Sequence, residues 1–153
     1  MSTTEPQPVI TSLPIDSEKR LMLFGGRASR QLAADIAAKL GVELGPVTLK
    51  TFSNGEVYCR YEESIRGADV FIVQSTSGNA QAGLTPNDAL MELLVMIDAA
   101  VGASAHRVIA VVPWFGYSRQ DKKSAPRRSS AAAPSARRWR SGRSARCRTS
   151  TAR

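Results

Sequence analysis

The chain has 153 residues, 42% of them hydrophobic, and a formal net charge of +8 at pH 7. Residues 1–123 carry 12 Lys and Arg residues against 13 Asp and Glu residues, whereas residues 124–153 carry 9 Arg residues and no acidic residue. The last segment also lacks Leu, Ile, Val and Phe, so it has nothing to bury in a core. We therefore expect a flexible leader (residues 1–20), a folded domain (residues 21–123) and a disordered Arg/Ala/Ser-rich tail (residues 124–153).

The two cysteines argue against a secreted or metal-bound framework. Cys59 and Cys147 lie far apart and form neither a disulfide pattern nor a metal-binding spacing. The leader contains three prolines and lacks the basic and apolar regions of a signal peptide, and no apolar run approaches the roughly 20 residues that cross a bilayer. We expect a cytoplasmic protein with no membrane partner.

The first strand and helix are marked at both ends. Residues 21–24 form a short apolar run that predicts a buried strand, ended by two glycines. Ser29 is a candidate N-cap for a helix that runs to about Leu40, with Gly41 as its C-terminal stop. The four-residue spacing of apolar side chains predicts that one face of this helix is buried: Leu32, Ile36 and Leu40.

A hairpin is predicted next. Residues 47–52 alternate between apolar and polar side chains, and Asn54-Gly55 is a strong hairpin-turn signal. Apolar side chains alternate again after the turn, at Val57, Cys59 and Tyr61. The turn is either a simple connector or a tip whose amide and carboxylate contact a base or ribose, and the spacing alone does not decide between them.

A second strand and helix follow. Residues 69–74 predict a buried strand, and the small polar residues 75–79 after it are a weak candidate for a phosphate-contacting turn. Thr85 and Pro86 mark the start of a helix that continues to Val101. We expect the helix to bury Leu90, Leu93, Leu94, Ile97 and Val101.

The last strand leads into the most distinctive segment of the chain. Residues 108–112 are all apolar and are stopped by Pro113, after which come three aromatic residues and the polar run at 118–123. In an open parallel sheet, ligands bind beyond the carboxyl ends of the strands. Guanidinium, amide and ammonium groups at that edge suit a phosphorylated, purine-like ligand, although the charges alone also fit a solvated basic turn. Together these elements predict an α/β fold, with a mostly parallel sheet flanked by helices, a protruding β-hairpin and a last strand at an exposed edge.

Four motifs in a fixed order carry a family resemblance. They are residues 52–56, residues 74–76, residues 87–94 together with 96–99, and residues 113–123. The stretch from Leu21 to Arg127 resembles the N-terminal half of ribose-phosphate pyrophosphokinases, which have phosphoribosyltransferase-like domains. The resemblance implies a ribose-phosphate diphosphokinase of nucleotide biosynthesis, with ATP and ribose 5-phosphate as substrates, Mg²⁺ as cofactor and a homo-hexameric assembly.

The resemblance also implies which residues bind ATP. Phe52 is similar to the ring that stacks on the base, and Asn54, Gly55 and Glu56 match a loop that reaches the adenine in a neighbouring subunit's site. Arg119, Gln120, Asp121 and Lys122 match the ATP-binding segment, where arginine offers a fork to phosphate. No residue is assigned a catalytic or metal-binding role.

The resemblance stops near Arg127. The family's metal motif, catalytic loop and ribose 5-phosphate loop do not follow, and the Arg/Ala/Ser/Pro bias of residues 128–153 is typical of a frameshifted GC-rich reading frame. We therefore expect a fragment that is inactive alone. The alternatives are a non-catalytic or regulatory subunit of a complete synthetase, or nucleic-acid binding through the basic tail, which is disfavoured because no binding module surrounds the tail arginines.

Overall fold

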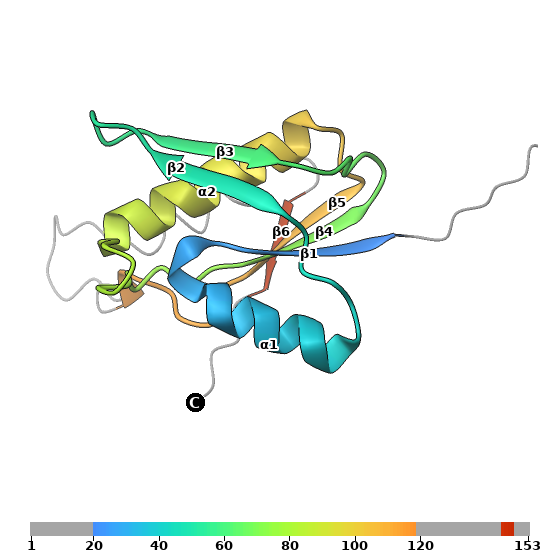
Figure 1. Cartoon of the computed structure of the whole chain (residues 1–153), viewed down its shortest axis with the longest axis horizontal. Helices are drawn as coiled ribbons and strands as arrows, with labels where there is room; N and C mark the ends of the chain where they lie inside the picture. The colour runs from blue at the N-terminus through green and yellow to red at the C-terminus, as the bar shows by residue number, and fades with distance from the viewer. Residues whose placement is uncertain (1–19, 119–144, 149–153) are drawn as a thin grey trace, which may run out of the picture.

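The computed structural model describes residues 20–118 and 145–148 of the chain. Four strands form a parallel sheet in the order β1-β4-β5-β6, and two form a separate antiparallel hairpin (Figure 1). The predicted α/β fold with a mostly parallel sheet and a protruding hairpin is therefore confirmed. The elements are β1 (Leu21–Gly25), η1 (Arg27–Ser29), α1 (Arg30–Leu40), β2 (Val47–Thr51), β3 (Val57–Tyr61), β4 (Asp69–Val73), α2 (Pro86–Gly102), β5 (Arg107–Val111) and β6 (Ala145–Arg148).

Strands β1, β4 and β5 pair without any offset. Each has five residues, and Gly25, Val73 and Val111 lie in one row across their carboxyl ends. The parallel bonding continues one step further, because Gly26 N donates to the Val73 carbonyl and Gln74 N to the Val111 carbonyl, both at 3.0 Å. The three strands therefore end level at the edge where ligands bind in parallel sheets.

Helix α1 covers one face of the sheet with small side chains. Ala33 and Ala37 are buried against it, whereas Leu32 and Leu40 are 40% and 59% exposed, so the predicted leucine stripe is wrong at both ends. The reason is close approach: a Cβ at Gly25 would lie only 2.6 Å from the Ala33 Cβ. Alanine fits this narrow gap between helix and strand, and leucine does not.

Helix α2 and the hairpin cover the other face. The Phe24 and Tyr61 rings meet edge to face with centroids 4.6 Å apart, and the Tyr61 hydroxyl donates to the Met96 carbonyl at 2.8 Å. Burial raises the pKa of the Tyr61 hydroxyl above its ordinary value. Since Phe24 is on β1, Tyr61 on β3 and Met96 on α2, these contacts bind the hairpin to the core.

The ends of α2 agree with the predicted signals. Thr85 is the N-cap and forms a reciprocal capping box with Asp88, with Pro86 at the first helical position. One prediction for its buried face is wrong, because Val101 at the last turn is 46% exposed. None of the helices in the described ranges is long and apolar enough to cross a membrane.

Strand β6 corrects one expectation about the sheet. Strand β5 was predicted to leave an open edge, yet Ala145–Arg148 pairs with β5 in parallel. Of the segment 124–153, which is predicted to be disordered, the structure describes only these four residues. An open sheet edge offers main-chain donors and acceptors, and any strand satisfies them without apolar side chains.

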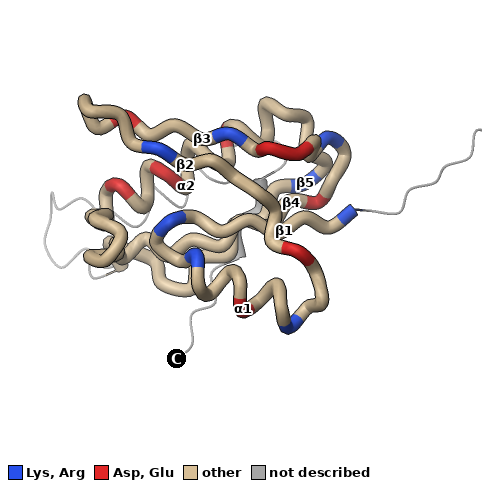
Figure 2. Tube along the Cα trace, in the orientation of Figure 1, with Lys and Arg blue, Asp and Glu red and all other residues tan. Residues whose placement is uncertain are grey.

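Along the described part of the trace, basic and acidic residues are interspersed (Figure 2).

Candidate functional site at the carboxyl edge of the sheet

Hydrogen bonds join the loops that follow the three level strands. Ser75 N donates to Ser29 Oγ at 2.8 Å, Thr76 N donates to the Trp114 carbonyl at 2.9 Å, and Gly116 N donates to Thr76 Oγ1 at 2.6 Å. Ser29 occupies the predicted N-cap position, but its hydroxyl makes no capping bond to α1 and accepts from Ser75 instead. These three hydrogen bonds thus connect the loops at the ends of β1, β4 and β5.

A cavity of about 580 Å³ opens at this edge, between the ends of β4 and β5 and the start of α2. Gly116 is needed at its floor, because a Cβ there would overlap the Thr76 carbonyl oxygen. Trp114, at the rim, is 60% exposed. The residues that line the cavity are Thr76, Ser77, Pro86, Asn87, Trp114, Gly116, Tyr117 and Ser118.

The chain leaves this cavity in a constrained conformation. Tyr117 has a left-handed backbone (φ 63°), unusual for a residue with a Cβ, and its hydroxyl donates to Asn87 Oδ1. Phe115 turns the other way and packs against the core. Ser118 is the last described residue before the predicted ATP-binding segment. The four candidates that follow it lie outside the described residues: Arg119, Gln120, Asp121 and Lys122.

A buried ion pair lies behind this edge. Glu92 of α2 is fully buried and accepts from Arg27 Nε through Oε2, while Oε1 accepts from Arg27 N at 2.7 Å and Gln74 Nε2 at 3.0 Å. Gln74, also fully buried, uses its own Oε1 to accept from Ala28 N at 3.2 Å. No buried side-chain nitrogen or oxygen of the described residues lacks a hydrogen-bond partner, so the buried charge of Glu92 is compensated.

The sequence patterns did not predict this pair, although one signal pointed to it. Glu92 lies on the same helical face as Ala89, Leu93 and Met96, all of which are buried. A carboxylate in an apolar stripe needs a cationic partner. What the sequence does not reveal is that Arg27, 65 residues earlier, is that partner.

The hairpin tip is exposed and ordered by local bonds. Phe52 is 52% exposed and meets Tyr58 edge to face, with centroids 6.1 Å apart. Asn54 Oδ1 accepts from Glu56 N at 3.1 Å, and Gly55 adopts a φ of 90°. The tip extends on the same side of the molecule as the carboxyl ends of the strands (Figure 1). The structure thus presents Phe52, Asn54, Gly55 and Glu56 at the surface, and their role in ATP binding stays a prediction.

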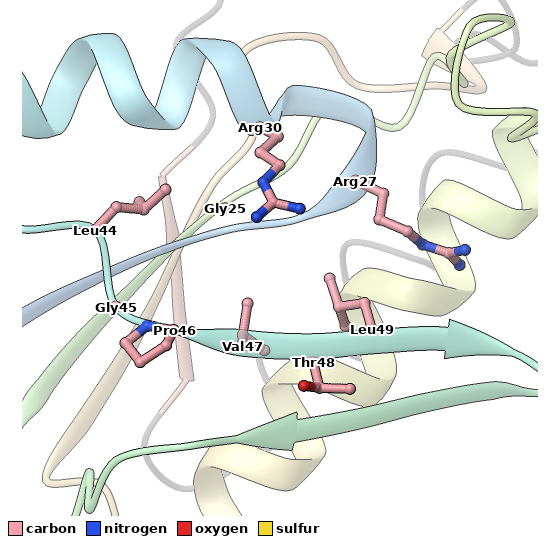
Figure 3. A pocket seen from close by; sticks show the side chains of 9 residues that line it. All are labelled: Gly25, Arg27, Arg30, Leu44, Gly45, Pro46, Val47, Thr48 and Leu49. Atoms are coloured by element: carbon pink, nitrogen blue, oxygen red, sulfur yellow. The ribbon is translucent and has the colours of Figure 1, made fainter.

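A second cavity, of about 480 Å³, lies between the start of α1 and strand β2. Figure 3 shows two arginines at its upper side with different orientations. Arg30 extends into the cavity, whereas Arg27 extends away from it toward α2. Residues of the segment 44–49 form the opposite wall.

A magnesium site built by side chains alone is not found among the described residues. No group of three or more His, Cys, Asp or Glu side chains in these ranges is placed to hold a metal ion. The predicted Mg²⁺ therefore does not fit this part of the chain as a protein-held ion. His106, the single histidine, is instead an exposed residue whose Nδ1 lies 2.8 Å from Asp69 Oδ1.

The matched motifs agree with one family over most of the chain. A family model described as the N-terminal domain of ribose phosphate pyrophosphokinase matches residues 21–138. The chain belongs to the ribose-phosphate pyrophosphokinase family. The match continues past Arg127, so the boundary at which the resemblance was expected to stop was set too early.

Individual members of the family show the same partial coverage. The chain is 47% identical over 125 residues to ribose-phosphate pyrophosphokinase 1, chloroplastic, of Oryza sativa, covering 82% of this chain and 30% of that protein. It is 46% identical over 114 residues to the ribose-phosphate pyrophosphokinase of Streptomyces avermitilis, covering 74% and 33%. The phosphoribosylpyrophosphate synthetase of Mycobacterium smegmatis superposes with a TM-score of 0.70 at 43% identity, covering 78% of this chain and 38% of that one. The chain thus spans about a third of the length of the relatives it matches.

Proposed function

We propose that this chain supplies the ATP-binding part of a ribose-phosphate diphosphokinase, which transfers the diphosphoryl group of ATP to the 1-hydroxyl of ribose 5-phosphate. Family membership over residues 21–138 supports this proposal. The structural observation that carries it is the pair of contacts from Thr76 to Trp114 and Gly116, which hold the ends of β4 and β5 together. Because of them, the residue before Arg119 lies at the carboxyl edge of the sheet, where parallel sheets bind ligands.

The chemistry of the candidate residues fits a nucleotide. A guanidinium from Arg119 forms paired hydrogen bonds to phosphate, and the amide of Gln120 can donate to and accept from a base edge. An exposed ring such as Phe52 offers a stacking face. Diphosphoryl transfer demands mainly positioning and charge stabilisation, which such side chains supply. Mg²⁺ enters the proposal with the nucleotide, since the described residues build no site for it.

The proposal extends to what this chain does not do alone. We propose that it needs further family segments to bind ribose 5-phosphate and complete the transfer, and that it acts in a homo-oligomer in which the hairpin tip reaches a neighbouring copy. The purified 153-residue chain should then form no AMP from ATP and ribose 5-phosphate. AMP formation by the chain alone would contradict this part of the proposal.

The nucleotide site is tested by isothermal titration of ATP into the full chain and two matched variants. Arg119→Ala removes a charged hydrogen-bond donor, so binding should weaken roughly tenfold or more. Arg107→Ala removes an exposed arginine at the amino end of β5, the opposite edge of the sheet, and should leave binding unchanged. Equal affinity of the parent chain and the Arg119→Ala variant would refute the assignment.

A further inference from the structure

Arg27 contacts both α2 and the last residue of β2. Its Nε donates to the fully buried Glu92 of α2, and its Nη2 donates to Thr51 Oγ1 at 2.8 Å. Thr51 directly precedes Phe52, whose backbone N–H donates to the Glu56 carbonyl at 2.8 Å and closes the tip loop. One guanidinium therefore joins the buried core to the base of the exposed tip.

The guanidinium is fixed in direction before it reaches the hairpin. Arg27 is bound at two points to Glu92, through its backbone N–H and its Nε, and its side chain is 25% exposed. Gln74 Nε2 also donates to this carboxylate, at 3.0 Å from the same Oε1 that accepts from the Arg27 backbone N–H. A planar guanidinium that is held through its Nε, on a residue whose backbone N–H binds the same carboxylate, loses little further freedom when its Nη2 binds a hydroxyl.

We infer that Arg27 is a positioning residue that fixes the direction of the hairpin tip relative to the carboxyl edge of the sheet. This inference rests on the proposed function, because the tip matters for nucleotide binding only if Phe52 and its neighbours contact ATP. Arg27 also stabilises the whole domain through its ion pair with Glu92. The positioning role is a separate effect through Thr51, which changes the hairpin more than it changes the core.

The neighbouring arginine provides the matched control. Arg30 lines the same cavity as Arg27 but extends into it (Figure 3), and no carboxylate of the described residues lies within ion-pair distance of its guanidinium. Arg30→Lys therefore makes the same substitution at a second arginine of this cavity and leaves the hydrogen bond from Arg27 to Thr51 intact. Arg27→Lys keeps a positive charge for Glu92, but a single ammonium nitrogen cannot occupy both positions of the guanidinium.

The test is amide hydrogen exchange of the full chain without nucleotide, compared between the hairpin peptide around residues 47–61 and the β4 core peptide. Thr51→Val, which removes the acceptor, should speed hairpin exchange roughly fivefold relative to the core, the size expected for one lost hydrogen bond. Thr51→Ser keeps the hydroxyl and should restore the parent rate. The Arg27→Lys variant should behave as Thr51→Val does, and Arg30→Lys as the parent chain does.

The double variant Arg27→Lys/Thr51→Val gives the decisive comparison. If the two residues act through one bond, the double variant exchanges no faster at the hairpin than either single variant. Multiplying effects, or equal acceleration in hairpin and core, would overturn the inference. Because no nucleotide is present, this outcome is independent of the ATP titration that tests the proposed function.

Discussion

Removing the Arg27 side chain should destabilise the protein far more than removing its neighbour. In Arg27→Ala, the fully buried Glu92 carboxylate keeps only two neutral donors, Arg27 N at 2.7 Å and Gln74 Nε2 at 3.0 Å. Breaking a buried ion pair from one side costs about 3–5 kcal/mol. The lower end, about 3 kcal/mol, applies here because two donors remain, and in a domain of this size that loss lowers Tm by roughly 12–24 °C.

The assay is urea unfolding followed by circular dichroism, with Arg30→Ala as the matched control. Arg30 makes no ion pair to a described carboxylate, so its removal should change the free energy of unfolding by no more than about 0.5 kcal/mol. Glu92→Gln is the complementary variant, and the double variant Arg27→Ala/Glu92→Gln should lose less than the sum of the two single losses. If Arg27→Ala is as stable as Arg30→Ala, the account of a buried, structure-determining ion pair is refuted.

Three further outcomes follow from the geometry. Hydrogen bonds from Thr85 lower the pKa of Asp88. The ionised carboxylate therefore stabilises the fold fully above its ordinary pKa near 4, and this stabilisation is lost as the pH falls through the lowered pKa. The Tm difference between the parent chain and Asp88→Asn should accordingly shrink below about pH 4. Burial, and secondarily the nearby Glu92 charge, raise the pKa of the Cys59 thiol to about 11, so its alkylation at pH 8, followed by peptide mass spectrometry, should be much slower than in urea. Gly116→Ala should cost about 1–3 kcal/mol in urea unfolding by displacing the β4 loop, whereas Gly102→Ala, with open space around it, should not destabilise.

Local signals in the sequence predicted the elements well, and contacts between distant segments were harder to predict. The strand at residues 69–74 and the start of α2 depend on neighbouring residues, as an apolar run or a Thr-Pro cap, and both are confirmed. Helix α1 was predicted over the right residues with the wrong buried side chains, because leucine and alanine stripes share one period. Which stripe is buried depends on how closely the helix approaches Gly25, a property of the packed structure.

The candidate site divides in the same way. The polar side chains of the hairpin tip and the order of the matched motifs predicted that residues 52–56 belong to the site. The structure presents these residues at the surface. The Arg27–Glu92 pair links residues 65 positions apart, and no local pattern encodes that distance. Strand β6 pairs through its main chain, so the side-chain composition of residues 124–153 gave no sign of it.

The level ending of β1, β4 and β5 makes the domain unequally tolerant of changes in length. A residue added after Ser77 lengthens a loop outside the strands and leaves the register of β4 with β1 and β5 unchanged. A residue deleted within β4 reverses the side-chain alternation downstream of it, so that Ile72 and Phe71 would exchange the faces they now occupy. Insertions and deletions can therefore change the shape of the site only in the connecting loops. Strands β1, β4 and β5 must each keep their length of five residues.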